Sequence, residues 1–141
     1  MVIKLLKKEN NDIAEIKRIR KLVFTDELKI PESCVFDELD NTSVQILISN
    51  NDTIIGTLRL RKYNDGVKLE RMAILPQFRK MSFGTKVIDE VKKFCIMNGE
   101  SKIFLDAIYD IMDFYKKCGF DKIGKVFERV GIPHIRMEMP I

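Results

Sequence analysis

A basic turn in front of an amphipathic helix is the part of this sequence best suited to chemistry. Residues 67–75 are typical of a strand, and the apolar periodicity of a helix follows the turn. A helix N-terminus offers unpaired N–H groups and about half a positive charge, so it binds phosphate readily. Arg79 and Lys80 add mobile positive charge, and Ser82 and Gly84 let a ligand approach the backbone closely. The turn therefore predicts a pyrophosphate site, with a plain solvated turn as the alternative.

Two motifs resemble the GNAT superfamily of N-acetyltransferases. Arg79 to Gly84 is similar to the Q/R-x-x-G-x-G/A signature that holds the pyrophosphate of coenzyme A, with Ser82 where the signature prefers glycine. Asp113 to Phe120 resembles the F-Y-x-x-x-G-F element of the same superfamily. The resemblance extends to the small single-domain branch that ElaA and YjcF typify. It also rests on Leu22 to Glu27, Asp37, Asp40, Gly56 to Leu60 and Gly131 to His134.

The resemblance implies acetyl-CoA as co-substrate, used in direct transfer without a metal. In resembling enzymes, the pantetheine arm of coenzyme A pairs with the backbone of the strand that here holds Met72 to Ile74. The expected cofactor-binding residues are Met72, Ala73, Ile74, Arg79, Lys80, Met81, Ser82, Phe83, Gly84 and Thr85.

Glu70 and Tyr115 are the candidates for acid–base catalysis. An amine is mostly protonated at neutral pH, so a base must remove a proton before attack, and Glu70 is expected to do so directly or through a water. The alternative is a half-exposed glutamate paired with Arg59 or Arg71. In resembling enzymes, a tyrosine at the place of Tyr115 protonates the departing thiolate; a core aromatic beside Phe114 is the alternative.

The acceptor side depends on scattered positions. Phe24, Glu27 and Asp37 lie where resembling proteins build the acceptor wall, with ordinary helix and loop residues as the alternative. His134, the only histidine, is expected to contact the acceptor or to serve the structure. The expected substrate-binding residues are Phe24, Glu27, Arg59, Arg61 and His134.

Arg59 and Arg61 fall on one face of an expected strand, because side chains alternate along it. There they would hold a phosphorylated acceptor bidentately, or else form an exposed face. Two positions depart from the branch and bear on the acceptor. Ile108 stands where glutamine is common, and Arg129 stands where an acidic residue often precedes the Gly-Ile-Pro-His turn.

The elements that must position these residues are expected in the order β-α-α-β-β-β-α-β-α-β-β. An antiparallel meander followed by a βαβ crossover predicts an α/β fold, with a mixed, mostly antiparallel sheet and helices on both faces. Asp110 and Asp113 resemble a capping box for the last helix. The expected strands are 2–6, 44–49, 53–63, 67–75, 102–107 and two around the turn 131–133; the expected helices are 12–24, 26–28, 83–98 and 110–118.

Composition limits the classes of function. The 141 residues suit a single domain, and 45% hydrophobic with 33% charged residues indicates a globular chain. No apolar run approaches the ~20 residues of a membrane span, and no signal-peptide core precedes the charged sequence, so a cytoplasmic protein is expected. The three cysteines are an odd number and lack CxxC or Cys/His spacing, so neither a disulfide framework nor a zinc site is expected. A net charge of +4 without a basic cluster predicts no nucleic-acid partner.

The predicted function is transfer of an acetyl group from acetyl-CoA to the primary amine of a small molecule. The most specific expectation is an amino-sugar phosphate such as glucosamine 6-phosphate. Acetylation of a protein N-terminus or lysine is an alternative, since Glu27, Asp37 and Asp40 would suit a basic peptide. A non-catalytic CoA-binding domain is another, and a homodimer is left open.

Overall fold

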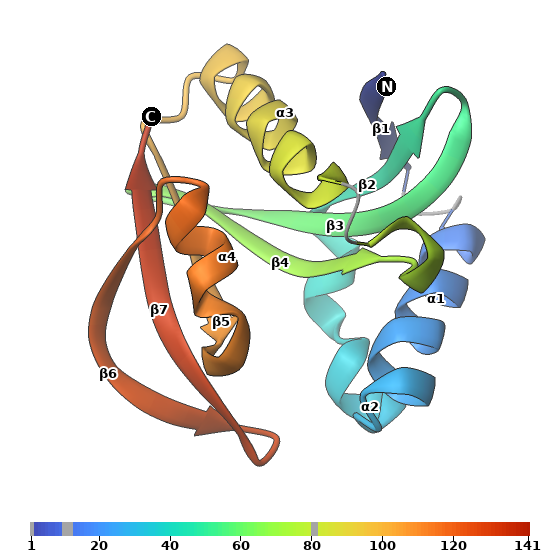
Figure 1. Cartoon of the computed structure of the whole chain (residues 1–141). Helices are drawn as coiled ribbons and strands as arrows, with labels where there is room; N and C mark the ends of the chain where they lie inside the picture. The colour runs from blue at the N-terminus through green and yellow to red at the C-terminus, as the bar shows by residue number, and fades with distance from the viewer. Residues whose placement is uncertain (1, 10–12, 80–81) are drawn as a thin grey trace.

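The computed structural model describes residues 2–9, 13–79 and 82–141. Its strands form one sheet in the order β1-β2-β3-β4-β5-β7-β6, and of the neighbouring pairs only β4 and β5 are parallel. The expected α/β class and mostly antiparallel sheet are confirmed (Figure 1). The strands are β1 Ile3–Lys8, β2 Val44–Asn50, β3 Thr53–Tyr63, β4 Gly66–Ile74, β5 Lys102–Ile108, β6 Asp121–Arg129 and β7 Ile132–Pro140. The α-helices are α1 Ala14–Arg20, α2 Glu32–Val35, α3 Phe83–Met97 and α4 Met112–Lys117.

Alternation along β2 explains why helices cover both faces of the sheet. Ile46 and Ile48 are buried in one cluster with Val87 of α3, whereas Leu47 between them is buried in a second cluster with Ile16 of α1. Successive side chains of a strand point to opposite faces, so the apolar run from Ile46 to Ile48 requires packing partners on both faces of the sheet. Figure 1 shows α1 and α2 on one side of β2, β3 and β4, and α3 on the other.

The helical segment before β2 differs from its expected division. Residues Lys21–Glu27 continue α1 as a π-helical turn, so the expected helices 12–24 and 26–28 are one run. The expected cap at Asn11 or Asp12 lies outside the described residues. The second helix, α2, follows Pro31 and does not end before it. Proline is tolerated there because the first N–H groups of a helix have no acceptor within the helix, so its missing N–H costs no hydrogen bond.

Two local expectations near the C-terminus are wrong. A 3₁₀ turn, Tyr109–Ile111, precedes α4, and no side chain caps the helix, so the capping box does not form. The last hairpin turns at Val130 and Gly131, with φ of 49° and 75°, while Ile132 already belongs to β7. Positive φ at both central residues is the geometry of a tight type I′ turn, which matches the twist of the strands.

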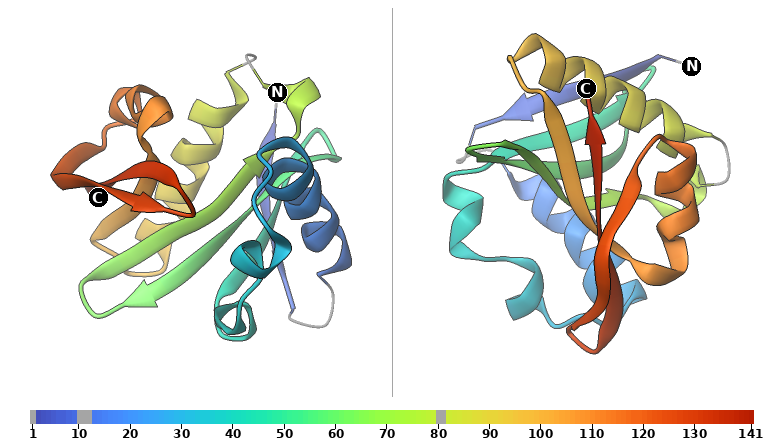
Figure 2. Two further views of the ribbon diagram at one scale, coloured as in Figure 1. Left: turned by 90° about the horizontal axis from the view of Figure 1, so that it is seen from below. Right: turned by 90° about the vertical axis from the view of Figure 1, so that its left-hand side faces the viewer.

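The feature that creates the site is the divergence of β4 from β5. Their pairing is limited to Val67 with Ile103 and Lys68 with Phe104, although both strands run on. On the other side of β4, Arg59 pairs with Glu70 and Thr57 with Ala73, so β4 carries one extra residue between these pairs. Arg71 lies in this bulge with a left-handed φ of 53°. β4 and β5 therefore separate beyond Lys68 (Figure 2).

Candidate active site

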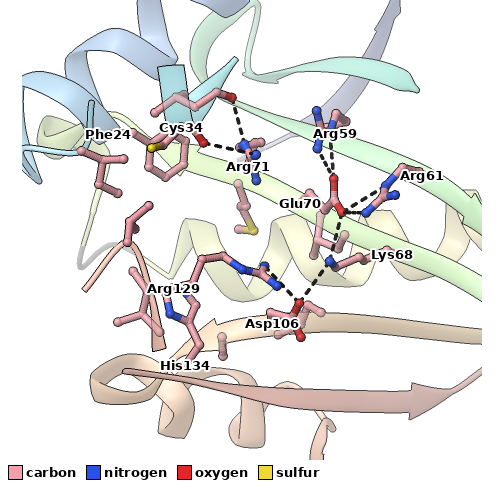
Figure 3. Close-up of a pocket in the computed structure, with 18 of the residues that line it drawn as sticks. Phe24, Cys34, Arg59, Arg61, Lys68, Glu70, Arg71, Asp106, Arg129 and His134 are labelled. Atoms are coloured by element: carbon pink, nitrogen blue, oxygen red, sulfur yellow. Dashed lines mark hydrogen bonds and ion pairs between the residues drawn. The ribbon is translucent and has the colours of Figure 1, made fainter. Parts of the chain in front are cut away.

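A cavity of about 360 Å³ lies where β4 and β5 separate. Its walls come from the segment between α1 and β2, from β3, β4 and β5, from the start of α4 and from the β6–β7 hairpin (Figure 3). This volume falls within the range of about 300–1,000 Å³ that is usual for small-molecule sites.

Glu70 occupies the wall of this cavity as a buried carboxylate held by three cations. One oxygen accepts from Arg59, through Nε at 2.9 Å and also through Nη2. The other accepts from Arg61 Nη2 at 2.6 Å and lies 3.2 Å from Lys68 Nζ. Burial alone would raise the pKa of Glu70, but the hydrogen bonds from Arg61 and Arg59 outweigh it and bring the pKa to about 2. Glu70 is therefore ionised at every pH of physiological interest.

Arg59 is enclosed by carboxylates and is only 1% exposed. Besides Glu70, its Nη1 donates to Asp37 at 2.7 Å and to Asp40 at 3.0 Å. Each guanidinium nitrogen therefore already has an acceptor. The prediction that Arg59 and Arg61 share a face is confirmed by their common partner Glu70, and the alternative of an exposed face is wrong for Arg59. Arg59 has no donor left for a phosphate unless an internal ion pair breaks.

Asp106 on β5 is a site residue that sequence reasoning missed. Its carboxylate accepts from Arg136 Nε at 2.6 Å and Arg129 Nη1 at 3.2 Å, and lies 3.0 Å from Lys68 Nζ. Burial alone would raise the pKa of Asp106, but the hydrogen bonds from Arg136 and Lys68 outweigh burial and lower the pKa to about 2. The sequence signal was a single carboxylate within the apolar run from Ile103 to Ile108, because a buried charge requires partners.

Tyr115 reaches the cavity from α4 and also packs in the core. Its ring lies 5.0 Å from that of Phe114 and 5.9 Å from that of Phe120, both edge to face. Within the described residues, no hydrogen bond is recorded for its hydroxyl, and burial raises the pKa of Tyr115 to about 12. The phenol therefore keeps its proton at neutral pH.

The expected cofactor segment divides into a free strand edge and a helix start. Met72, Ala73 and Ile74 lie on β4 beyond its last pairing with β5. Ser82 precedes α3 with a left-handed φ of 63° and forms no side-chain cap, so its hydroxyl leaves the first helical N–H groups available. Phe83 is buried and Thr85 is exposed. Lys80 and Met81 lie outside the described residues.

Gly84 brings the two motifs of the sequence into contact. A Cβ added at Gly84 would lie 2.9 Å from Cζ of Phe114, so any larger residue there would have to displace the Phe114 ring. The edge of β4 beyond Lys68, apart from the Ile74 carbonyl oxygen that accepts from Arg79, and the uncapped start of α3 both offer backbone groups to the pantetheine arm and pyrophosphate of coenzyme A. The residues present fit that co-substrate.

Arg79 and Glu27 bind each other. Arg79 Nη1 and Nη2 donate to the carboxylate of Glu27 at 2.5 and 2.9 Å, and its Nε donates to the carbonyl oxygen of Ile74 at 2.9 Å. Glu27 is exposed and is not among the residues that line the cavity. The expectation that Glu27 forms part of the acceptor wall is therefore wrong. The pair instead ties the π-helical turn to the basic loop.

The remaining acceptor candidates do line the cavity. Phe24 comes from the π-helical turn, and His134 comes from β7. His134 Nδ1 donates to the carbonyl oxygen of Ile132 at 2.7 Å, and its ring stacks on Phe127. Ile108 and Arg129 line the same cavity, so both departures from the branch pattern face the space where an acceptor would bind.

Two wider observations concern the described part of the chain. No helix there is both long enough and apolar enough to cross a bilayer. No three His, Cys, Asp or Glu side chains there come together in a group that could hold a metal ion.

Comparison with known proteins agrees with the resemblance of the sequence to GNAT acetyltransferases. Residues 26–141 match the profile of the acetyltransferase (GNAT) domain. The N-acetyltransferase YjcF of Bacillus subtilis is 29% identical over 134 residues, which cover 94% of this chain and 96% of YjcF. The crystal structure of Escherichia coli ElaA superposes with a TM-score of 0.81 at 23% identity, covering 98% and 99% of the two chains. An aminoglycoside 6′-N-acetyltransferase complexed with coenzyme A gives 0.72 at 16% identity, covering 99% and 97%.

Proposed function

Because this chain belongs to the GNAT acetyltransferase family, and is an acetyl-CoA-dependent N-acetyltransferase, we propose that its cavity receives the primary amine of a small molecule. The observation that carries the proposal is the edge of β4 beyond Lys68, which β5 leaves unpaired and which borders the cavity directly. A donor bound along that edge and an acceptor in the cavity would meet beside Tyr115. The volume of about 360 Å³ favours a small acceptor over a peptide groove.

Coenzyme A is proposed to bind along the backbone of Met72 to Ile74 and at the start of α3. Bound there, acetyl-CoA supplies the activated acetyl group as a thioester. Ser82 to Thr85 offer the helix N–H groups, and Lys80 adds charge. Since the Arg79 side chain is held by Glu27, we propose that Arg79 contributes its backbone and its local charge and not a free guanidinium.

The proton of the acceptor amine is the first chemical problem for this site. With a pKa of about 2, Glu70 is a weak proton acceptor, so we propose that it acts through a water and mainly as the centre of the ionic cluster. Five cationic and three acidic side chains line the cavity. Nearby positive charge disfavours an ammonium ion, so the cavity itself would lower the pKa of a bound amine.

The leaving thiolate is the second problem. Tyr115 lines the cavity with its proton retained, and we propose that it is the general acid. The N–H groups of Met72 and Ala73, in and after the bulge of β4, are the proposed donors to the developing negative charge on the carbonyl oxygen.

Glucosamine 6-phosphate remains the specific acceptor that we propose. An excess of positive charge in the cavity supports a phosphorylated amine. Of the two arginines expected to bind the phosphate, only Arg61 keeps some exposure, with 23% of its side chain accessible, because Arg59 is fully used inside the protein.

The function can be tested in two steps. Acetyl-CoA should raise the melting temperature of the protein, and a panel of amino-sugar phosphates, amino acids, polyamines and peptides should then reveal acetylated products by mass spectrometry. Products from small amines would support the proposal. Stabilisation by acetyl-CoA without any acetylated product would instead indicate a CoA-binding domain, and preference for peptides would overturn the small-molecule assignment.

A further inference from the structure

Arg129 extends from the end of β6 to the wall of the cavity (Figure 3). Its side chain is 48% exposed, and its Nη1 donates to Asp106 at 3.2 Å. The guanidinium also lies 5.4 Å from the ring centroid of Phe127. Within the described residues no other hydrogen bond of Arg129 is recorded. Since guanidinium has five N–H donors, most of its binding capacity is open.

More of the donor groups of the other cavity cations are bound to acceptors within the protein. Arg59 is enclosed by three carboxylates, and Lys68 is buried between Glu70 and Asp106. Arg71 donates to the carbonyl oxygen of Val35 at 3.0 Å and to Asp37 at 3.3 Å. Among the five cations that line the cavity, Arg129 therefore has the most exposed side chain and the fewest hydrogen bonds and ion pairs within the described residues.

We propose that Arg129 binds an anionic group, a carboxylate or a phosphate, on the acceptor, and so restricts the enzyme to amines that carry one. This inference rests on the proposed acetyl transfer. Planar guanidinium suits bidentate binding of either anion. Asp106 does not offer an opposite site for a cation, because Lys68, Arg129 and Arg136 already neutralise it.

The hairpin that carries Arg129 has a strained tip. Val130 follows with a φ of 49°, a left-handed conformation that a β-branched side chain rarely adopts. Val130 lines the cavity beside Arg129. Such strain persists only where surrounding structure enforces it and is common in ligand-binding segments. The tight turn thereby fixes the place from which the guanidinium enters the cavity.

The chain contains a matched control for this role. Arg136 donates to the same carboxylate of Asp106, at 2.6 Å through Nε, and its side chain is 44% exposed, close to that of Arg129. Arg136 is not among the residues that line the cavity. Arg129→Gln and Arg136→Gln therefore each remove one positive charge from beside Asp106, but only the first removes a cation that lines the cavity.

The experiment compares two acceptor pairs that differ by one anionic group, glucosamine 6-phosphate with glucosamine, and alanine with alaninamide. The parent enzyme should prefer the anionic member of at least one pair by kcat/KM, and the pair that shows it separates phosphate from carboxylate. Arg129→Gln should reduce that preference about 10- to 100-fold, mainly through the KM of the acceptor, as expected for a charged hydrogen bond. Arg136→Gln should retain the preference, and Arg129→Glu should reverse it.

Three results would overturn the inference. A parent enzyme that acetylates neutral members as well as anionic ones would refute it while leaving acetyl transfer intact. Equal loss of preference in Arg129→Gln and Arg136→Gln would show that Arg129 serves only to neutralise Asp106. If acetyl-CoA binds but no amine is acetylated, the proposed function fails, and this inference fails with it.

Discussion

Glu70 shows how strongly the setting of one residue changes its chemistry. Placed among Arg59, Arg61 and Lys68, its carboxylate gains so much from being charged that its pKa falls to about 2. Tyr115 moves in the opposite direction, because burial raises its pKa to about 12. One group is thus kept ionised and the other kept protonated, and pairs driven apart in this way are typical of acid–base sites.

Tyr115→Phe tests the proposed acid. The ring packing against Phe114 and Phe120 is retained, so stability and both KM values should change little. Turnover should fall about 10- to 1,000-fold, the usual worth of general acid catalysis. Because the phenol stays protonated to about pH 12, the deficit should be the same from pH 6 to 9 in steady-state assays. Tyr109→Phe, at an exposed tyrosine of the same segment, is the control; equal effects of both variants would contradict the assignment.

Glu70→Gln should affect both stability and rate. Removing one partner of a buried ion pair leaves uncompensated cations, so unfolding free energy should fall by about 3 kcal/mol or more in urea titrations. At a temperature where the variant remains folded, its rate deficit should shrink as pH rises, because the amine then loses its proton unaided. A deficit that stays constant across pH would assign Glu70 a purely structural role.

At the scale of elements, the start of α3 combines the family signature with a strained backbone position. Ser82 adopts a left-handed φ of 63° at the position where the family signature has glycine. Two residues later, Gly84 permits the ring of Phe114 to lie against α3. A large side chain at Gly84 would therefore disturb the packing of α4 as well as the proposed binding of coenzyme A, so it cannot test the cofactor site cleanly.

Ser82→Gly is the cleaner test of this element. Glycine adopts the left-handed conformation without the steric cost of a Cβ, so the variant should gain up to about 1 kcal/mol in unfolding free energy. The KM for acetyl-CoA should fall or stay unchanged. Ser82→Ala keeps the strain and loses the hydroxyl, so it should gain nothing. A stabilised Ser82→Ala would contradict the backbone explanation.

At the scale of the whole molecule, one ionic network joins segments far apart in the chain. It runs from Arg20 of α1 through Asp40 to Arg59, then through Glu70 and Lys68 to Asp106 and the β6–β7 hairpin. The network holds the helical segment, the centre of the sheet and the last hairpin around one cavity, and Figure 3 shows its part from Arg59 to Arg129. Apart from the exposed Arg129 at its end, the charges of this network are buried, so salt screens them little.

Acid should therefore destabilise the protein through this network. The pKa values of Glu70 and Asp106 are lowered to about 2, so their stabilisation is complete above the values of the unfolded chain, near 4, and is lost as pH falls toward 2. Urea midpoints should drop steeply between pH 5 and 2.5. Asp106→Asn should be less stable at pH 7, with the gap narrowing in acid.

Asp65 provides the control for this prediction. It is an exposed carboxylate 3.0 Å from Lys102, outside the network, and an exposed pair contributes little. Asp65→Asn should follow the parent protein at every pH. If Asp106→Asn does the same, the buried network does not set the acid response.

Local patterns alone determined the order and layering of this protein. The alternation in β2, the 3.6-residue periodicity of α3 and the turn residues between strands require only neighbours in sequence, and they predicted an antiparallel meander, a crossover and helices on both faces. The motif around Ser82 likewise predicts where coenzyme A binds, and this stays a prediction. What failed locally was the choice among short helical turns near Pro31 and Asp110, where no side-chain cap marks the start of either helix.

Only the tertiary structure decided which charges meet. Arg59 lies opposite Glu70 in the register of β3 on β4, just before the bulge at Arg71 shifts that register, and Arg79 meets Glu27 across 52 residues of chain. Asp106 joins them from a strand that is parallel to β4 for only two residue pairs. Sequence spacing predicts which face a side chain takes, but the partner across a sheet depends on register and on where strands separate, which long-range packing sets.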